Sequence, residues 1–128
     1  MKFNILLSVG VGGFFGAILR FTLSSYIQKF TNSTFPFGTL GVNILGSFII
    51  GFLFLYFQYV NLSLNQKAIF VTGLLGALTT FSTFSWETLF LIQEGLFGKA
   101  ILNIFLNITL SLGATLLGVA LFRKIYGV

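Results

Sequence analysis

The stretch GLLGALTTFSTFS, residues 73–85, decides the fold of this 128-residue chain. Five of its last seven residues carry hydroxyl groups, and two glycines precede them inside an apolar run. Glycine, serine and threonine have poor helix propensity, and hydroxyl side chains compete for backbone hydrogen-bonding groups. We therefore expect a membrane-spanning helix that is interrupted here. Such interruptions occur at membrane depth where the backbone lines a cavity or an ion site, and exposed backbone oxygens there can hold a small cation.

Apolar runs account for most of the chain around this stretch. Hydrophobic residues make up 56% of the sequence and charged residues 7%, whereas soluble domains carry about 25% charged residues. A spanning helix needs about 20 mostly apolar residues, and four runs qualify: 5–27, 39–59, 68–92 and 100–122. The links between them are short. The sequence predicts an all-α membrane protein, with a single four-helix transmembrane domain over residues 1–128 and a break in the third helix.

Composition excludes several chemistries. The chain has no cysteine, histidine or aspartate, and its only carboxylates are Glu87 and Glu94. Disulfides, thiolate or imidazole metal sites and histidine acid–base catalysis therefore lack their residues, and the two glutamates form no obvious pair for hydrolysis. We do not expect an enzyme. The seven basic residues stand mostly at the edges of apolar runs, where they can reach lipid headgroups. This distribution indicates a lipid bilayer as partner and no nucleic acid.

The basic residues at the ends of the apolar runs predict only weakly how the chain is oriented in the membrane. The first side carries four basic residues, Lys2, Lys67, Arg123 and Lys124. The other side carries two, Lys29 and Lys99, with Arg20 close by inside the first span. A small bias of this kind permits insertion in both orientations and pairing of inverted copies.

The first span combines small residues with one charge. Gly12 and Gly16 form a GxxxG spacing that Gly13 and Ala17 repeat, and such faces let helices approach closely. Packing is the favoured role of these residues. A charged side chain such as Arg20 costs about 2.5–3.5 kcal/mol at a helix centre. Arg20 either extends its side chain to the membrane interface or provides a fixed positive charge for a nearby anion.

Polar residues recur at helical spacing in the second and fourth spans. Thr39, Asn43 and Ser47 recur every four residues and share one helix face. The Asn43 amide needs a partner in hydrocarbon, either a structural hydrogen bond to a neighbouring helix or a passing anion. A stripe in the fourth span must likewise face protein or water, and it consists of Asn103, Asn107, Ser111 and Thr115.

Two aromatic residues stand among the hydroxyls of the third span. Phe81 and Phe84 lie three residues apart, so their rings can face the same route as Thr80 and Ser82. An aromatic ring edge carries partial positive charge, and an anion can rest against it. Glu87, one turn further on, either hydrogen-bonds a hydroxyl or lies near water at a pore end, or it is a helix-end carboxylate.

The polar groups inside the spans are mostly hydrogen-bond donors. A cation pathway would use rings of carboxylates, and proton relays use Asp, Glu or His within spans. Amides, hydroxyls, ring edges and one arginine instead favour an anion, and a small one, because donors replace hydration only if they crowd around the ion.

These residues resemble the Fluc/CrcB family of fluoride channels in all four spans. The motifs that match are Gly12-Gly13, Gly16-Ala17, Arg20-Phe21, Gly38-Thr39, Asn43, Gly46-Ser47, Gly76 and Thr79-Thr80-Phe81-Ser82-Thr83-Phe84. The resemblance implies an antiparallel, dual-topology homodimer with two fluoride pores at the subunit interface. It also implies passive, fluoride-selective export across the plasma (inner) membrane of a microbe.

The resemblance also implies roles for particular residues. The predicted fluoride pathway consists of Asn43, Phe81, Phe84, Ser82, Thr83, Thr39, Thr80, Asn103 and Asn107. Gly76 and Thr79 would give backbone carbonyls to a structural sodium ion (Na+) at the dimer centre, and Arg20 would lie near the aqueous vestibule. Many family members place a tyrosine where Asn103 aligns, so Asn103 and Asn107 would rebuild that wall of the pore here.

Two other functions stay open at this point. A small four-helix multidrug exporter also assembles from inverted subunits, but it needs a membrane carboxylate, which the first span lacks. A structural subunit of a larger membrane complex is the second alternative. Fluoride flux from the purified protein alone would distinguish a channel from both.

Overall fold

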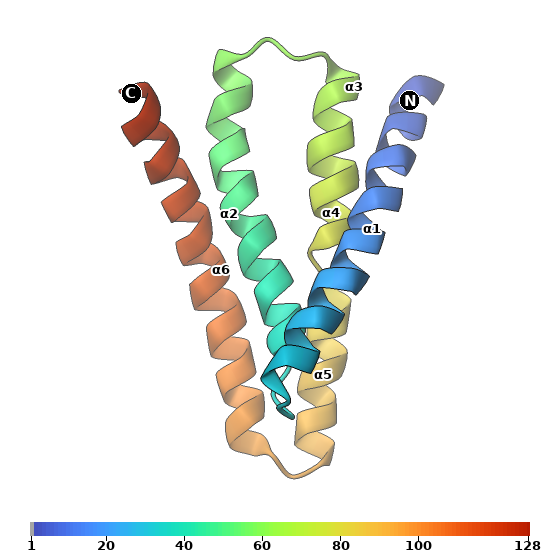
Figure 1. Ribbon diagram of the computed structural model, residues 1–128, viewed down its shortest axis with the longest axis vertical. Helices are drawn as coiled ribbons and strands as arrows, with labels where there is room; N and C mark the ends of the chain where they lie inside the picture. Colours follow the sequence, from blue (N-terminus) through green and yellow to red (C-terminus); the bar gives the residue numbers. More distant parts are fainter. Residues whose placement is uncertain (1) are drawn as a thin grey trace.

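The computed structural model describes residues 2–128, and Figure 1 shows this part of the chain as long helices joined by short links. Four helical stretches in it are long and apolar enough to cross a membrane: Phe3–Thr31, Phe37–Tyr59, Leu64–Gln93 and Phe97–Tyr126. Each contains one of the predicted spans and extends it by a few residues. The chain is an all-helical, multi-pass membrane protein, as predicted.

The third of these stretches is not one continuous helix. It begins with α3 (Leu64–Lys67) and continues as η1 (Ala68–Leu75), a π-helix, and as the single turn α4 (Gly76–Leu78). The helix α5 (Phe81–Gln93) starts only after a break at residues 79–80. The predicted interruption is therefore confirmed. The π-helical winding before it was not predicted.

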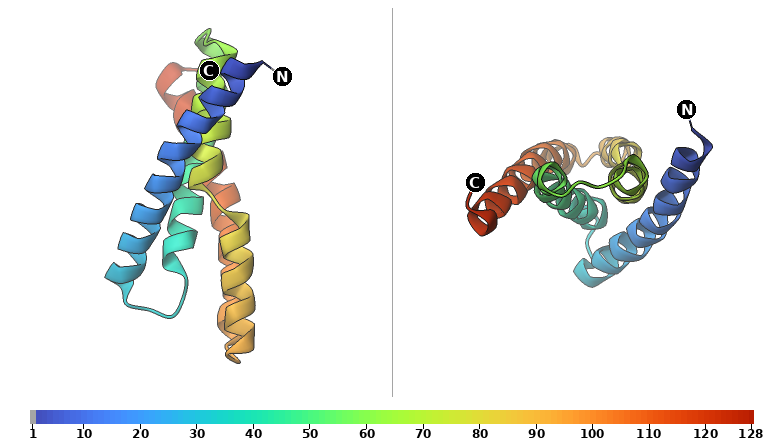
Figure 2. Two further views of the ribbon diagram at one scale, coloured as in Figure 1. Left: turned by 90° about the vertical axis from the view of Figure 1, so that its right-hand side faces the viewer. Right: turned by 90° about the horizontal axis from the view of Figure 1, so that it is seen from above.

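The long helices pack in two pairs. The helix α1 (Phe3–Thr31) lies along η1, and α2 (Phe37–Tyr59) lies along α6 (Phe97–Tyr126). Figure 2 shows the same pairing from the side and from above. The two pairs diverge toward the end that carries the α2–α3 link and approach one another near the break (Figure 1).

Glycines in both pairs let the helix backbones touch. A Cβ atom at Gly12 would collide with the carbonyl oxygen of Ile69, and one at Gly73 would lie 2.7 Å from the carbonyl oxygen of Val9. In the second pair, a Cβ atom at Gly51 would collide with the backbone of α6. The packing role predicted for the small residues of the first span is confirmed at Gly12.

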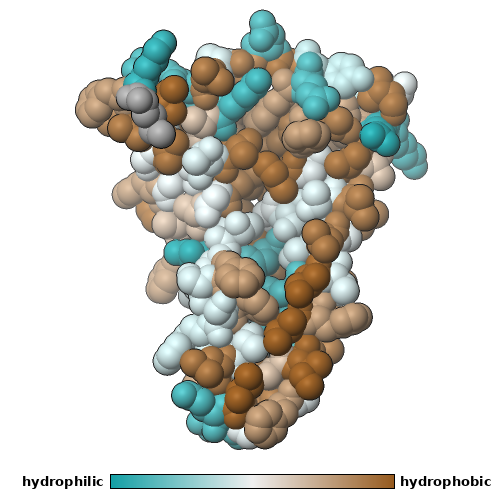
Figure 3. Space-filling view, turned by 180° about the vertical axis from the view of Figure 1, so that it is seen from behind, coloured by the Kyte–Doolittle hydropathy of each residue, from teal (hydrophilic) through white to brown (hydrophobic). Residues whose placement is uncertain are grey.

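The outer surface is that of a protein in lipid. Large apolar side chains are exposed along every long helix, among them Phe14, Phe54, Phe90 and Phe105. Figure 3 shows hydrophobic side chains over much of one face, with the hydrophilic ones gathered mainly at its two ends. Both chain ends and the α2–α3 link lie at one of these ends, and the α5–α6 link lies at the other (Figure 1).

Candidate functional site

The side chain of Asn43 forms hydrogen bonds with the backbone at the break in the third span. Thr79 and Thr80 have extended backbones, with φ, ψ of −86°, 157° and −151°, 121°. Asn43 Oδ1 accepts a hydrogen bond from the Thr80 N–H at 2.8 Å, and Asn43 Nδ2 donates to the Thr80 carbonyl oxygen at 3.1 Å. Water is absent at membrane depth, so this double pairing satisfies backbone groups that the break exposes. Asn43 therefore has the structural hydrogen bond that was one of its two predicted roles.

A chain of hydrogen bonds leads from Asn43 into α6 and on to α5. Asn43 Nδ2 also donates to Asn107 Oδ1 at 3.0 Å. Asn107 Nδ2 donates to the side-chain and backbone oxygens of Asn103, both at 2.9 Å. Asn103 Nδ2 donates to the Thr88 hydroxyl at 2.9 Å, and this hydroxyl donates to the Phe84 carbonyl oxygen at 2.8 Å. Three helices are thus joined around the break.

A cavity of about 420 Å³ adjoins this chain, and Asn43, Asn107, Phe81 and Phe84 all line it. The two phenylalanine rings lie 5.3 Å apart, centroid to centroid, at an interplanar angle of 64°. Phe84 is buried, whereas Phe81 is 78% exposed. Ser111 also lines the cavity, and its hydroxyl oxygen is buried in the protein and, within residues 2–128, has no hydrogen-bond partner. The structure thus places both rings in the same cavity as Thr80, whereas Ser82 does not line it.

The N-terminus of α5 begins at the same place. Thr80 Oγ1 accepts a hydrogen bond from the backbone N–H of Thr83 at 3.2 Å, so Thr80 is the N-cap of this helix. The Thr80 hydroxyl also lies 3.1 Å from Thr83 Oγ1 and 3.3 Å from Ser82 Oγ. A helix N-terminus carries partial positive charge and unpaired N–H groups, which favour an anion nearby.

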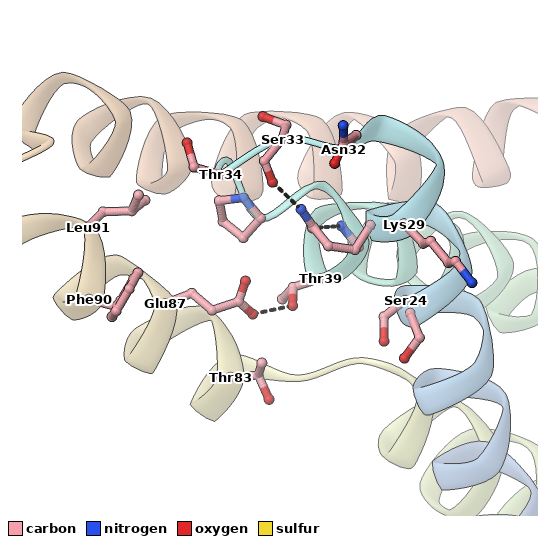
Figure 4. A pocket seen from close by; sticks show the side chains of 14 residues that line it. Ser24, Lys29, Asn32, Ser33, Thr34, Thr39, Thr83, Glu87, Phe90 and Leu91 are labelled. Carbon is pink, nitrogen blue, oxygen red and sulfur yellow. Dashed lines mark hydrogen bonds between the residues drawn. The ribbon is translucent and has the colours of Figure 1, made fainter. Parts of the chain in front are cut away.

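A second cavity, of about 820 Å³, lies between the end of α1, the start of α2 and α5 (Figure 4). Thr39 of α2 donates a hydrogen bond to Glu87 Oε1 of α5 there, and Figure 4 shows the two side chains pointing toward one another. Lys29 and Thr83 also line this cavity. Glu87 therefore has the hydrogen bond to a hydroxyl that was one of its predicted roles.

Gln28 fixes the link that borders the second cavity, and this role was not predicted. Its Nε2 donates to the carbonyl oxygens of Ser33 at 2.7 Å and Phe35 at 2.9 Å. Its Oε1 accepts from the Gly38 N–H at 3.0 Å. The signal that could have found it is an amide at the end of an apolar span, because such a group must be satisfied. Gln28 holds the α1–α2 link against the start of α2.

Arg20 lies beside hydroxyls of the break. It lines a cavity of about 230 Å³ together with Thr39, Thr80 and Thr83. Arg20 is half-buried on α1. Arg20 therefore shares a cavity with three hydroxyl-bearing residues, and its role toward an anion stays a prediction.

The carbonyl oxygens near the break suit a hard cation. In a continuous α-helix the Thr80 N–H would bond the carbonyl oxygen of Gly76, but here it bonds Asn43. The Gly76 carbonyl is thereby released from that partner, and Gly76 is exposed. Within residues 2–128, no group of three or more His, Cys, Asp or Glu residues could hold a metal ion. A sodium ion here would take neutral oxygens, including those of Gly76 and Thr79, and such ligands suit hard cations.

The predicted pathway residues do not share one cavity. Those that line the 420 Å³ cavity are Asn43, Thr80, Phe81, Phe84 and Asn107. Thr39 and Thr83 line the larger cavity instead. Asn103 is only 1% exposed and lies behind Asn107 in the hydrogen-bond chain, and Ser82 is exposed next to Thr80. Thr88, which completes the chain, was not predicted.

These features define a class: a small four-span membrane protein in which polar groups gather at a broken third helix. Residues 7–119 match the family described as "CrcB-like protein, Camphor Resistance (CrcB)". The chain is 56% identical to a "Fluoride-specific ion channel FluC" of a Nitratiruptor species, over 99% of this chain and 98% of that one. It is 57% identical to a protein of the same name from a Sulfurovum species, over 99% of this chain and 100% of that one. The chain belongs to the CrcB family, which confirms the resemblance seen in the sequence.

Proposed function

We propose that the protein is a passive, fluoride-selective ion channel that exports fluoride from the cytoplasm across the inner membrane of a microbe. One observation carries the proposal: Asn43, Phe81 and Phe84 meet at a broken helix in a chain whose relatives are named fluoride-specific ion channels. A channel rather than an enzyme also agrees with the absence of paired carboxylates, thiols and imidazoles from the sequence.

The chemistry of the site supports a small anion as cargo. Fluoride leaves water only where donors crowd around it, and the break offers amides, hydroxyls and the N-terminus of α5. The rings of Phe81 and Phe84 add edges of partial positive charge. Arg20 raises the local concentration of anions at its cavity. In this reading, Thr39, Thr83 and Glu87 form one end of the route.

We further propose an antiparallel homodimer with two pores, held by a structural sodium ion. Gly76 and Phe81 are exposed at the break, and in the proposed dimer a second copy of the chain packs against this surface. Four basic residues lie on one side of the predicted spans and two, with Arg20 close by, on the other, and this weak bias supports insertion in both orientations. A bound sodium ion would supply positive charge between the carbonyl oxygens of Gly76 and Thr79 and those of the partner copy.

The decisive experiment measures fluoride efflux from liposomes that contain only the purified protein. A passive channel gives fast, electrogenic fluoride flux without a pH gradient and much slower chloride flux. A proton-coupled multidrug exporter would need the gradient, and a structural subunit would give no flux. Absence of fluoride flux would end the proposal.

Two substitutions test the site within the same assay. We expect Asn43→Ala and Phe81→Ile to lower fluoride flux at least about tenfold, because each removes a group that lines the 420 Å³ cavity. Thr109→Val is the matched control, since Thr109 is exposed on α6 and bonds only its own helix at Phe105. Unchanged flux in both variants would remove the site assignment.

Replacing sodium during purification should weaken the dimer, and a dimer indifferent to sodium would contradict the cation site.

A further inference from the structure

The three buried asparagines form a chain whose direction is fixed by backbone groups. The Thr80 N–H can only donate and its carbonyl can only accept, so Asn43 must turn Oδ1 to the first and Nδ2 to the second. The second hydrogen of Asn43 Nδ2 then requires an acceptor, and Asn107 presents Oδ1. Asn107 Nδ2 in turn faces the carbonyl oxygen of Asn103, which can only accept. Oxygen and nitrogen of each amide are therefore assigned by their partners.

This direction leaves Asn43 without a spare donor. An amide nitrogen carries two hydrogens, and for Asn43 Nδ2 they go to Thr80 and to Asn107. An anion that contacts Asn43 must therefore replace one of these two acceptors. Replacing the Thr80 carbonyl would leave a backbone group of the break unpaired at membrane depth, which is costly. Replacing Asn107 Oδ1 leaves the double pairing between Asn43 and Thr80 intact.

The position of the Asn43–Asn107 bond makes this exchange accessible. Both residues line the 420 Å³ cavity, together with Phe81 and Phe84. Asn107 is itself held by Asn103, which is held by Thr88. An anion in the cavity thus meets a donor that is oriented in advance but already occupied.

We propose that Asn107 is a positioning residue that sets fluoride affinity: its Oδ1 accepts from Asn43 Nδ2 until an anion in the cavity takes its place. This inference rests on the proposed function, because it concerns the same anion site. Asn107 keeps the Asn43 amide satisfied and correctly turned while the cavity holds no anion. It also competes with the anion, so binding is weakened and release is eased. Conduction needs binding that is weak enough to let the ion leave.

The test measures fluoride flux as a function of fluoride concentration for three variants. Asn107→Leu removes the competing acceptor, and we expect the half-saturating fluoride concentration to fall by about three- to tenfold, with a maximal flux no higher than that of the parent chain. Asn107→Asp keeps an acceptor oxygen and adds negative charge, so the half-saturating concentration should rise. Thr109→Val is the control, because Thr109 is exposed and bonds only its own helix at Phe105, and its half-saturating concentration should stay within about twofold of the parent value.

Half-saturating fluoride concentrations that shift in opposite directions in the leucine and aspartate variants distinguish a positioning role of Asn107 from a packing role. A packing role for Asn107 would lower the yield or the maximal flux of the leucine and aspartate variants without moving half-saturation in opposite directions, and that result would overturn the proposal. If Asn107→Leu does not elute as a monodisperse protein, the smaller Asn107→Ala takes its place. Loss of folded protein in both would show that Asn107 maintains the fold and would also overturn it. Absence of flux in the parent chain would instead refute the proposed function.

Discussion

The two halves of the third span are held in the protein by different means. The first half, η1, lies against α1 with backbone touching backbone at Gly12 and Gly73. The second half begins where Asn43 bonds the backbone of Thr80, and Thr88 of α5 bonds Asn103 of α6. Lipid supplies no hydrophobic force between helices, so close packing and buried hydrogen bonds remain as the attractive contacts. Each half relies mainly on one of them.

The difference teaches how each half responds to substitution. A contact between backbones depends on the absence of a side chain, and any added atom must push two helices apart. A hydrogen-bonded contact depends on particular atoms, and a substitution of the same shape removes one bond at a time. We therefore expect abrupt effects on the α1–η1 side and graded effects on the α5 side.

The largest effect is expected for Gly12→Val. Its side chain would collide with the backbone at Ile69, and backbone cannot move away as a flexible side chain can. The folded state should lose about 3 kcal/mol or more. Thermal unfolding in detergent and the yield of monodisperse protein measure this loss. Gly10→Val is the control, because nothing lies within 4 Å of a Cβ atom at Gly10. Equal melting temperatures for the two variants would contradict the backbone contact.

Thr88→Val should have an intermediate effect. Valine keeps the shape of threonine, but the buried Asn103 Nδ2 loses its acceptor at 2.9 Å. Leaving a buried donor unpaired costs about 1–3 kcal/mol. The melting temperature in detergent should fall accordingly, and Thr88→Ser, which retains the hydroxyl, should recover most of the loss. A valine variant as stable as the parent chain would show that the end of the hydrogen-bond chain contributes nothing.

Ser63→Ala should have the smallest effect, since it lies outside both halves at the start of α3. Ser63 and Gln66 form a capping box: Ser63 Oγ accepts from the Gln66 N–H at 3.2 Å, and Gln66 Oε1 accepts from the Ser63 N–H at 3.0 Å. Losing an exposed cap costs about 1 kcal/mol or less. Fluoride flux in liposomes should stay within about twofold of the parent value. A larger change in flux would mean that this link communicates with the break.

The sequence alone was sufficient to predict where the four spans lie and where the third is broken. Apolar runs of the right length predict the four helices, and the hydroxyl-rich stretch after two glycines predicts the interruption, because both signals are local. The partner of Asn43 could not be predicted in the same way. The sequence shows that its amide needs partners, but Thr80 is 37 residues away and contributes backbone groups, which every residue carries.

For α6 the sequence predicted a stripe of polar residues but not the hydrogen bonds that they form. The i+4 spacing of Asn103 and Asn107 predicts a face that avoids lipid, yet it does not say that one amide lines a cavity while the other lies behind it. That distinction depends on how α5 and α6 cross, which places Thr88 beside Asn103. The winding of η1 was likewise not predicted, because its residues are mostly apolar and carry no local signal for a wide turn.

The π-helical segment has a consequence for how the span is rotated along its length. The Gly76 N–H reaches back five residues to the Val71 carbonyl oxygen, so η1 takes up more chain per turn than an α-helix does. If η1 kept its residues but wound as an α-helix, it would make more turns, and the residues after it would be rotated relative to those before it. Gly73 could then no longer face α1 while Thr80 faces α2. The wide turns of η1 thus set how the third span is rotated along its length. This rotation lets Gly73 contact α1 while Thr80 bonds Asn43 of α2.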